Sequence, residues 1–93
     1  MKKVLFISLL FAVSTLIGKE ITITGQIIST HDEAGGGYGI QTKKGVYQLC
    51  YEWDNANIVN KLSSLNESAT NVQIKGKIKD KWTLDCNSLQ IKN

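Results

Sequence analysis

The chain has 93 residues, with 11 lysines and arginines against 8 acidic residues and a formal net charge of +3. Lys2 and Lys3 belong to a predicted leader, and the rest of the chain, with nine lysines and eight acidic residues, is near +1. No arginine occurs anywhere in the sequence. Arginine is the side chain that grips phosphate or guanine in two places at once, so this composition argues against nucleic-acid binding.

The first residues have the order of a secretory signal, since two lysines precede an apolar run over 4–17 that ends beside a small residue. The run is too short for a comfortable membrane span. We therefore expect a signal peptide over 1–18, cleaved near Gly18, and one domain over 19–93 that is periplasmic or secreted, with no membrane span. An uncleaved N-terminal anchor is the alternative.

A strand is predicted over 21–27, where isoleucines alternate with polar residues. Gly25 in its middle indicates a bulge or a corner of the kind that small barrels need. Residues 31–37 follow, with His31, an acidic pair and three consecutive glycines, and they predict a flexible loop that could approach a ligand closely. With one histidine and no second ligand at a diagnostic spacing, we expect no metal site here.

Two more strands are expected over 38–42 and 46–52, joined by a short hairpin in which Gly45 takes a left-handed conformation. Possible helix caps lie over 54–57. The apolar residues Ile58, Leu62 and Leu65 then follow at helical spacing, which predicts a helix of about ten residues with one buried stripe.

The segment 72–79 alternates valine, isoleucine and glycine with lysine and glutamine, and predicts a strand with a solvated lysine face. In the last predicted strand, Trp82, Leu84 and Cys86 share one face. The apolar residues that follow have the opposite parity, so we expect a bulge near 87–88 that keeps both sets on the core.

The two cysteines, Cys50 and Cys86, are expected to pair because the chain is predicted to be exported. The bond would close a loop of about 37 residues and contribute on the order of 4 kcal/mol in the chain-entropy model. Two free thiols are one alternative. A redox pair is another, although such pairs usually have the C-x-x-C spacing that is absent here.

Three strands, a helix and two strands, with a glycine in the first and fourth strands, resemble the OB-fold. The likeness spans the mature chain and rests on this element order and on the stretches ITITGQIIS and VQIKGKI. It implies an all-β fold with one short helix, in which a five-stranded Greek-key barrel has the helix between strands three and four. It also implies that strands three and five lie side by side, in agreement with a Cys50–Cys86 bond.

A narrower likeness is to the cell-binding B subunits of pentameric, Shiga-type bacterial toxins, through the stretches ITGQIIST, EWDNANIVNKLSSL and NVQIKG. In that family the disulfide ties the first strand to a late one, whereas here no cysteine lies near Ile21. No sugar-binding residue is therefore carried over. This likeness implies a homo-oligomeric ring that recognises a host-cell glycan.

The stretch VYQLCYEW over 46–53 is the candidate binding surface. If Cys50 faces inward to meet Cys86, strand alternation sends Tyr47, Leu49 and Tyr51 outward, onto the face where OB-folds commonly bind ligands. If Leu49 faces inward instead, the tyrosines belong to the core. The first alternative makes the candidate ligand-binding residues Tyr38, Tyr47, Tyr51, Trp53 and His31.

Catalytic motifs are absent from the sequence. His31 is the sole histidine, and it has no serine, cysteine or acidic partner in the arrangement of a known triad. Asp32 and Glu33 are adjacent and so point apart, which makes a poor acid–base pair. We expect a non-enzymatic exported binding module without metal or cofactor, whose partner is a glycan or a protein, and a toxin B subunit is the alternative function.

Overall fold

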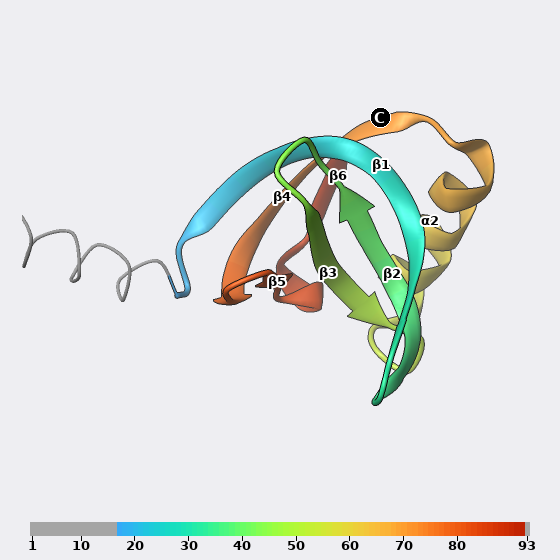
Figure 1. Cartoon of the computed structure of the whole chain (residues 1–93), viewed down its shortest axis with the longest axis horizontal. Coiled ribbons are helices and arrows are strands. Elements are labelled where there is room, and N and C mark those ends of the chain that lie inside the picture. Colours follow the sequence, from blue (N-terminus) through green and yellow to red (C-terminus); the bar gives the residue numbers. More distant parts are fainter. Residues whose placement is uncertain (1–16, 93) are drawn as a thin grey trace, which may run out of the picture.

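A computed structural model describes residues 17–92, so most of the predicted signal peptide lies outside the described residues. The described chain is mostly β-structure with one α-helix (Figure 1). In chain order its elements are β1 (Glu20–Asp32), β2 (Gly35–Gln41), β3 (Val46–Tyr51), α2 (Ala56–Ser68), β4 (Asn71–Asp80), β5 (Thr83–Leu84), a 3₁₀ turn (Cys86–Ser88) and β6 (Gln90–Lys92).

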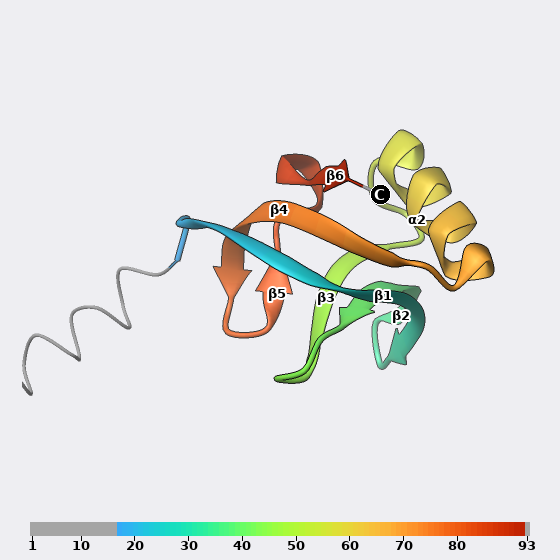
Figure 2. The same cartoon turned by 90° about the horizontal axis from the view of Figure 1, so that it is seen from above.

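Five strands close a ring in the order β1, β2, β3, β5, β4 and back to β1. The ring closes because β1 pairs with two neighbours, β4 along its first half and β2 along its second half (Figure 2). β3 and β5 meet in parallel at Gln48 and Thr83, and β6 adds to β4. The predicted fold class, mostly β with one helix between the third and fourth strands, is confirmed, and the five strands predicted to form a barrel form this closed ring.

Gly25 lies where β1 passes from one neighbour to the other. It pairs with Val72 of β4, and the pairing with β2 begins at the next residue, Gln26. A Cβ atom on Gly25 would lie 2.0 Å from the carbonyl oxygen of Gln41. The two strands can approach this closely only because the residue has no side chain, so the predicted corner lies at this glycine.

The predicted loop over 31–37 is wrong, because most of it is paired strand. β1 continues to Asp32 and β2 begins at Gly35, which leaves a two-residue connection. His31 pairs with Gly36 in the ladder. Gly37 is buried, and a Cβ atom there would lie 2.3 Å from the carbonyl oxygen of Cys50. The glycine run therefore allows close packing between strands rather than flexibility.

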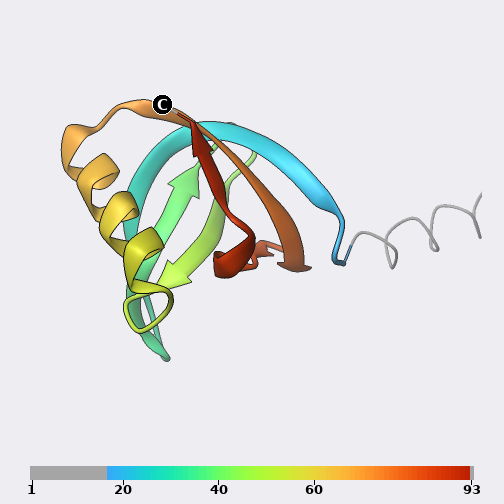
Figure 3. The same ribbon diagram turned by 180° about the vertical axis from the view of Figure 1, so that it is seen from behind.

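The helix α2 lies against one end of the ring (Figure 3) and contacts β1, β2 and β3. Asn55 caps its N-terminus by accepting backbone hydrogen bonds from Asn57 and Ile58. Leu62 and Leu65 are buried, as the helical spacing predicted. Among the described residues, no helix is long and apolar enough to cross a membrane.

The predicted disulfide is confirmed: Cys50 and Cys86 are bonded, with their Cα atoms 5.0 Å apart. Cys86 lies in the 3₁₀ turn after β5, and β6 then continues along β4 in the same direction as β5, since both strands pair antiparallel with β4. Where the sequence predicted a bulge near 87–88, the structure has this 3₁₀ turn, which divides the last strand into β5 and β6. Leu89 and Ile91 pack against the core, as expected. The side chain of Asp85 caps the turn by accepting a hydrogen bond from the Asn87 amide. The core around the disulfide consists of Ile27, Ile40, Leu49, Leu62, Leu65, Val72, Ile74 and Leu84.

Candidate functional site

The direction of the β3 side chains follows from a shift in its pairing with β2. Tyr38 lies opposite Cys50, but the next residue, Gly39, lies opposite Gln48, so Leu49 is an extra residue in β3. Such a bulge breaks the alternation of the strand. Leu49 and Cys50 are both buried, at 2% and 1% exposure. The prediction that an inward Cys50 sends Leu49 outward is wrong.

The predicted binding residues do not form one surface. Tyr38 and Tyr47 are half-buried and pack against the core, and Tyr51 is also half-buried. Trp53 and His31 are exposed. Tyr47 contacts Trp82, and the tyrosine at the other end of β3 contacts Trp53. The structure thus divides the aromatic residues of VYQLCYEW between two places.

The first place is an aromatic clamp over the β1–β2 hairpin, formed by Tyr51, Trp53 and Asp32. The two rings stack with centroids 4.8 Å apart and an interplanar angle of 8°. The Tyr51 hydroxyl donates a 2.6 Å hydrogen bond to Asp32 Oδ2. Asp32 Oδ1 accepts from the backbone amides of Ala34 and Gly35. Both carboxylate oxygens of Asp32 already accept hydrogen bonds from within the protein, which favours a structural role for the clamp.

The hydrogen bond between Tyr51 and Asp32 shifts the pKa of both groups. The hydrogen bond from the Tyr51 hydroxyl has the largest effect on the pKa of the Asp32 carboxyl, which it lowers. The hydrogen bonds from the two backbone amides lower this pKa further. The Asp32 carboxylate in turn raises the pKa of the Tyr51 hydroxyl. Each shift favours the pair in its hydrogen-bonded form.

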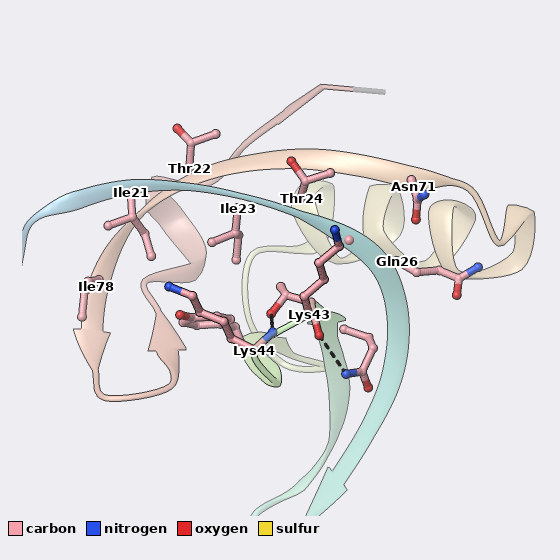
Figure 4. A pocket seen from close by; sticks show the side chains of 13 residues that line it. Ile21, Thr22, Ile23, Thr24, Gln26, Lys43, Lys44, Asn71 and Ile78 are labelled. Carbon is pink, nitrogen blue, oxygen red and sulfur yellow. Dashed lines mark hydrogen bonds between the residues drawn. The ribbon is translucent and has the colours of Figure 1, made fainter.

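The second place is a groove of about 900 Å³ between the first half of β1 and the turn that joins β2 to β3 (Figure 4). Ile21 and Ile23 point from β1 into the groove, whereas the side chains of Thr22 and Thr24 point away from it. The apolar part of its lining consists of Ile21, Ile23, Tyr47 and Ile78, all half-buried.

Aromatic surface continues from the groove beyond Tyr47. The ring of Trp82 lies 4.8 Å from that of Tyr47 at an angle of 53°. A Cβ atom on Gly45 would lie 3.5 Å from the Trp82 ring, so the indole covers the hairpin turn. Trp82 and Val46 are 40% and 38% exposed. Sequence reasoning placed Trp82 on the core face with Leu84 and Cys86, and the structure corrects this position.

Two lysines supply the charge of the groove. Lys43 and Lys44 extend from the hairpin turn toward β1, the first toward Thr24 and the second toward Ile21 (Figure 4). Over residues 17–92 the one ion pair joins Lys75 to Glu20, so neither groove lysine has a carboxylate oxygen within 4.0 Å in that part of the chain. The groove therefore combines apolar side chains with uncompensated positive charge.

The sequence analysis missed this groove. Its isoleucines and lysines were interpreted as a strand face and a hairpin turn, and nothing in the alternation shows that the two segments face each other. Within the described residues, no group of three or more histidine, cysteine, aspartate or glutamate side chains could hold a metal ion. Comparison with models of protein families, with curated proteins and with solved structures finds no match to this chain.

Proposed function

We propose that this protein is a small, exported, non-enzymatic binding module of OB-fold type, with its ligand site in the groove between β1 and the β2–β3 turn. The observation that carries the proposal is that apolar side chains line the groove beside two lysines. Among the described residues, neither lysine has a carboxylate oxygen within 4.0 Å. The Cys50–Cys86 bond supports export, because disulfides persist in oxidising compartments.

The groove has the composition of a binding site. Its volume of about 900 Å³ falls within the range of known ligand pockets, which are mostly apolar with a few polar groups that orient the ligand. Tyr47 offers a large, stiff contact area, and Lys43 and Lys44 attract negative charge. A ligand with an apolar body and acidic groups matches this chemistry.

The site can be tested with anilinonaphthalene sulfonate, a fluorescent probe that carries an aromatic body and one negative charge. We expect saturable binding, with shifts of the methyl NMR signals of Ile21, Ile23 and Ile78. Replacing both groove lysines by glutamine should weaken binding about fivefold, since an exposed charge contributes up to about 1 kcal/mol. Lys77→Gln with Lys79→Gln, on the exposed face of β4, is the matched control. Equal weakening by both pairs of substitutions would contradict the proposal.

A pentameric B subunit that binds a host-cell glycan is the second candidate function. The observation that favours it is Trp53, which is 62% exposed and stacks on Tyr51, because an exposed indole can pack against a sugar ring. Native mass spectrometry tests the assembly: a pentamer supports this candidate and a monomer excludes it. A glycan array with wild type and Trp53→Ala tests the platform, and unchanged glycan binding in the variant would remove it.

A further inference from the structure

Part of β1 has only one strand partner. Residues 20–26 pair with β4 on one side, and pairing with β2 on the other side begins only at Gln26. β2 ends at Gln41, opposite Gln26, and the chain turns away into the hairpin. Within residues 17–92, the side of residues 21–25 that faces away from β4 therefore has no strand beside it. We call this side the open edge of β1, and it borders the groove.

The backbone groups on the open edge can be identified from the hydrogen bonds on the other side. Ile78 of β4 donates its amide to the Lys19 carbonyl at 2.9 Å. Backbone groups of a strand face the same side at every second residue, so Ile21 and Ile23 also direct theirs to β4. Thr22 and Thr24 then direct their amide and carbonyl groups to the open edge. Gln26, the next even-numbered residue, is where the pairing with β2 starts, as this alternation requires.

The side chains around the open edge define what can lie there. Ile21 and Ile23 point into the groove beneath the edge, and two lysines approach it from the opposite wall (Figure 4). A strand placed on this edge would pack alternate side chains against the isoleucines. Acidic side chains at its ends would meet Lys43 and Lys44, which have no carboxylate oxygen within 4.0 Å in the described chain.

We propose that the occupant of the groove is an extended acidic peptide segment that adds to the open edge of β1 as a further strand. The inference rests on the proposed function, which places the ligand site in this groove, and it names the ligand class. Recognition of this kind draws affinity from backbone hydrogen bonds and specificity from alternate side chains. The edge of five residues is roughly 17 Å long, enough for a short peptide strand.

The first experiment screens a displayed library of random linear peptides, each of roughly ten residues, against the purified disulfide-bonded protein. We expect the enriched peptides to carry apolar residues at alternate positions and at least one acidic residue near an end. Binding should weaken about fivefold when both groove lysines become glutamine, and should not change with the matched β4 lysine variants.

Amide hydrogen exchange then tests the geometry. The amides of Thr22 and Thr24 should exchange rapidly in the free protein and at least tenfold more slowly with bound peptide, because they gain a hydrogen-bond partner. The amide of Ile23 is the internal control, since its partner is β4 and its protection should not depend on the peptide. Two N-methylated versions of an enriched peptide should behave differently. Methylation of the backbone nitrogens that face β1 should abolish binding, and methylation of the alternate nitrogens, which face solvent, should leave it unchanged.

The results separate failure of this inference from failure of the proposed function. If no peptide binds but anilinonaphthalene sulfonate still shifts the Ile21 and Ile23 signals, the groove is a ligand site and the strand inference is wrong. If neither probe reaches the groove, both proposals are wrong. Thr22 and Thr24 amides already protected in the free protein, together with a dimeric native mass, would show that a second copy covers the edge and would also overturn the inference.

Discussion

The hydroxyl of Tyr51, at the end of β3, donates a 2.6 Å hydrogen bond to the carboxylate of Asp32, at the end of β1. This bond ties the third strand to the β1–β2 hairpin across 19 positions of sequence. It lowers the pKa of Asp32 and raises the pKa of Tyr51.

The stabilising effect of this pair should depend on pH at both ends of the scale. Because the folded pKa of Asp32 lies below its ordinary value of 3.8, the stabilisation is present above that value and is lost as the pH falls through the folded pKa. For Tyr51 the folded pKa lies above 10.0, so the stabilisation is present below that value and is lost as the pH rises through the folded pKa. Carboxyl NMR titration should show the pKa of Asp32 rising toward its ordinary value in Tyr51→Phe.

The matched control for this titration is Tyr38→Phe, which removes a hydroxyl from another half-buried tyrosine. It should leave the Asp32 titration unchanged. The backbone amides of Ala34 and Gly35 should keep part of the shift in Tyr51→Phe. An identical Asp32 titration in wild type and Tyr51→Phe would contradict the role assigned to the hydrogen bond.

Removal of the disulfide by Cys50→Ala with Cys86→Ala should lower the free energy of unfolding by about 4 kcal/mol, because the bond joins residues 36 positions apart and restricts the unfolded chain. Urea denaturation followed by circular dichroism measures the loss. For a domain of this size the loss approaches the whole net stability, so part of the variant population should be unfolded at room temperature. A variant with unchanged urea midpoint would show that the bond is dispensable.

Gly25→Ala should destabilise the protein by about 3 kcal/mol or more, since its Cβ atom would meet the carbonyl oxygen of Gln41 at 2.0 Å and backbone would have to move. Gly36→Ala is the control. There the nearest atom is the end of the Glu52 side chain at 3.0 Å, which can rotate away. Thermal denaturation should separate the two variants by well over 4 °C, and equal melting temperatures would argue against the corner at Gly25.

Ala69→Gly should raise the free energy of unfolding by about 0.5–1 kcal/mol. Ala69 ends α2 with φ of 53°, a left-handed conformation that costs an alanine energy and a glycine almost none. Its carbonyl accepts a hydrogen bond from the Gln26 side chain at 2.7 Å, so the backbone should keep this conformation. Ser64→Gly, at an exposed position inside the helix, should instead lower stability. Denaturation midpoints that move the same way in both variants would contradict this account.

Much of the fold could be predicted from local pattern. Alternation located the strands, the spacing of Leu62 and Leu65 located the helix, and two cysteines in a chain with a predicted leader indicated the disulfide. The strands and the helix depend on residues close in sequence, and with only two cysteines each has a single possible partner. The glycine run was wrongly predicted as a flexible loop, because its role depends on a residue far away in the sequence. Gly37 lies in a paired strand where the backbone of Cys50, from another strand, approaches closely.

The directions of Leu49 and Cys50 could not be predicted, because strict alternation allows only one of two neighbours to face inward. A shift in the pairing between β2 and β3 buries both. The groove was equally beyond the sequence. It exists because β1 exchanges one partner for another at Gly25, which brings the open edge of β1 opposite Lys43 and Lys44. The pairing of strands in the closed ring decides which strand edges are covered, and no pattern along the sequence predicts that pairing.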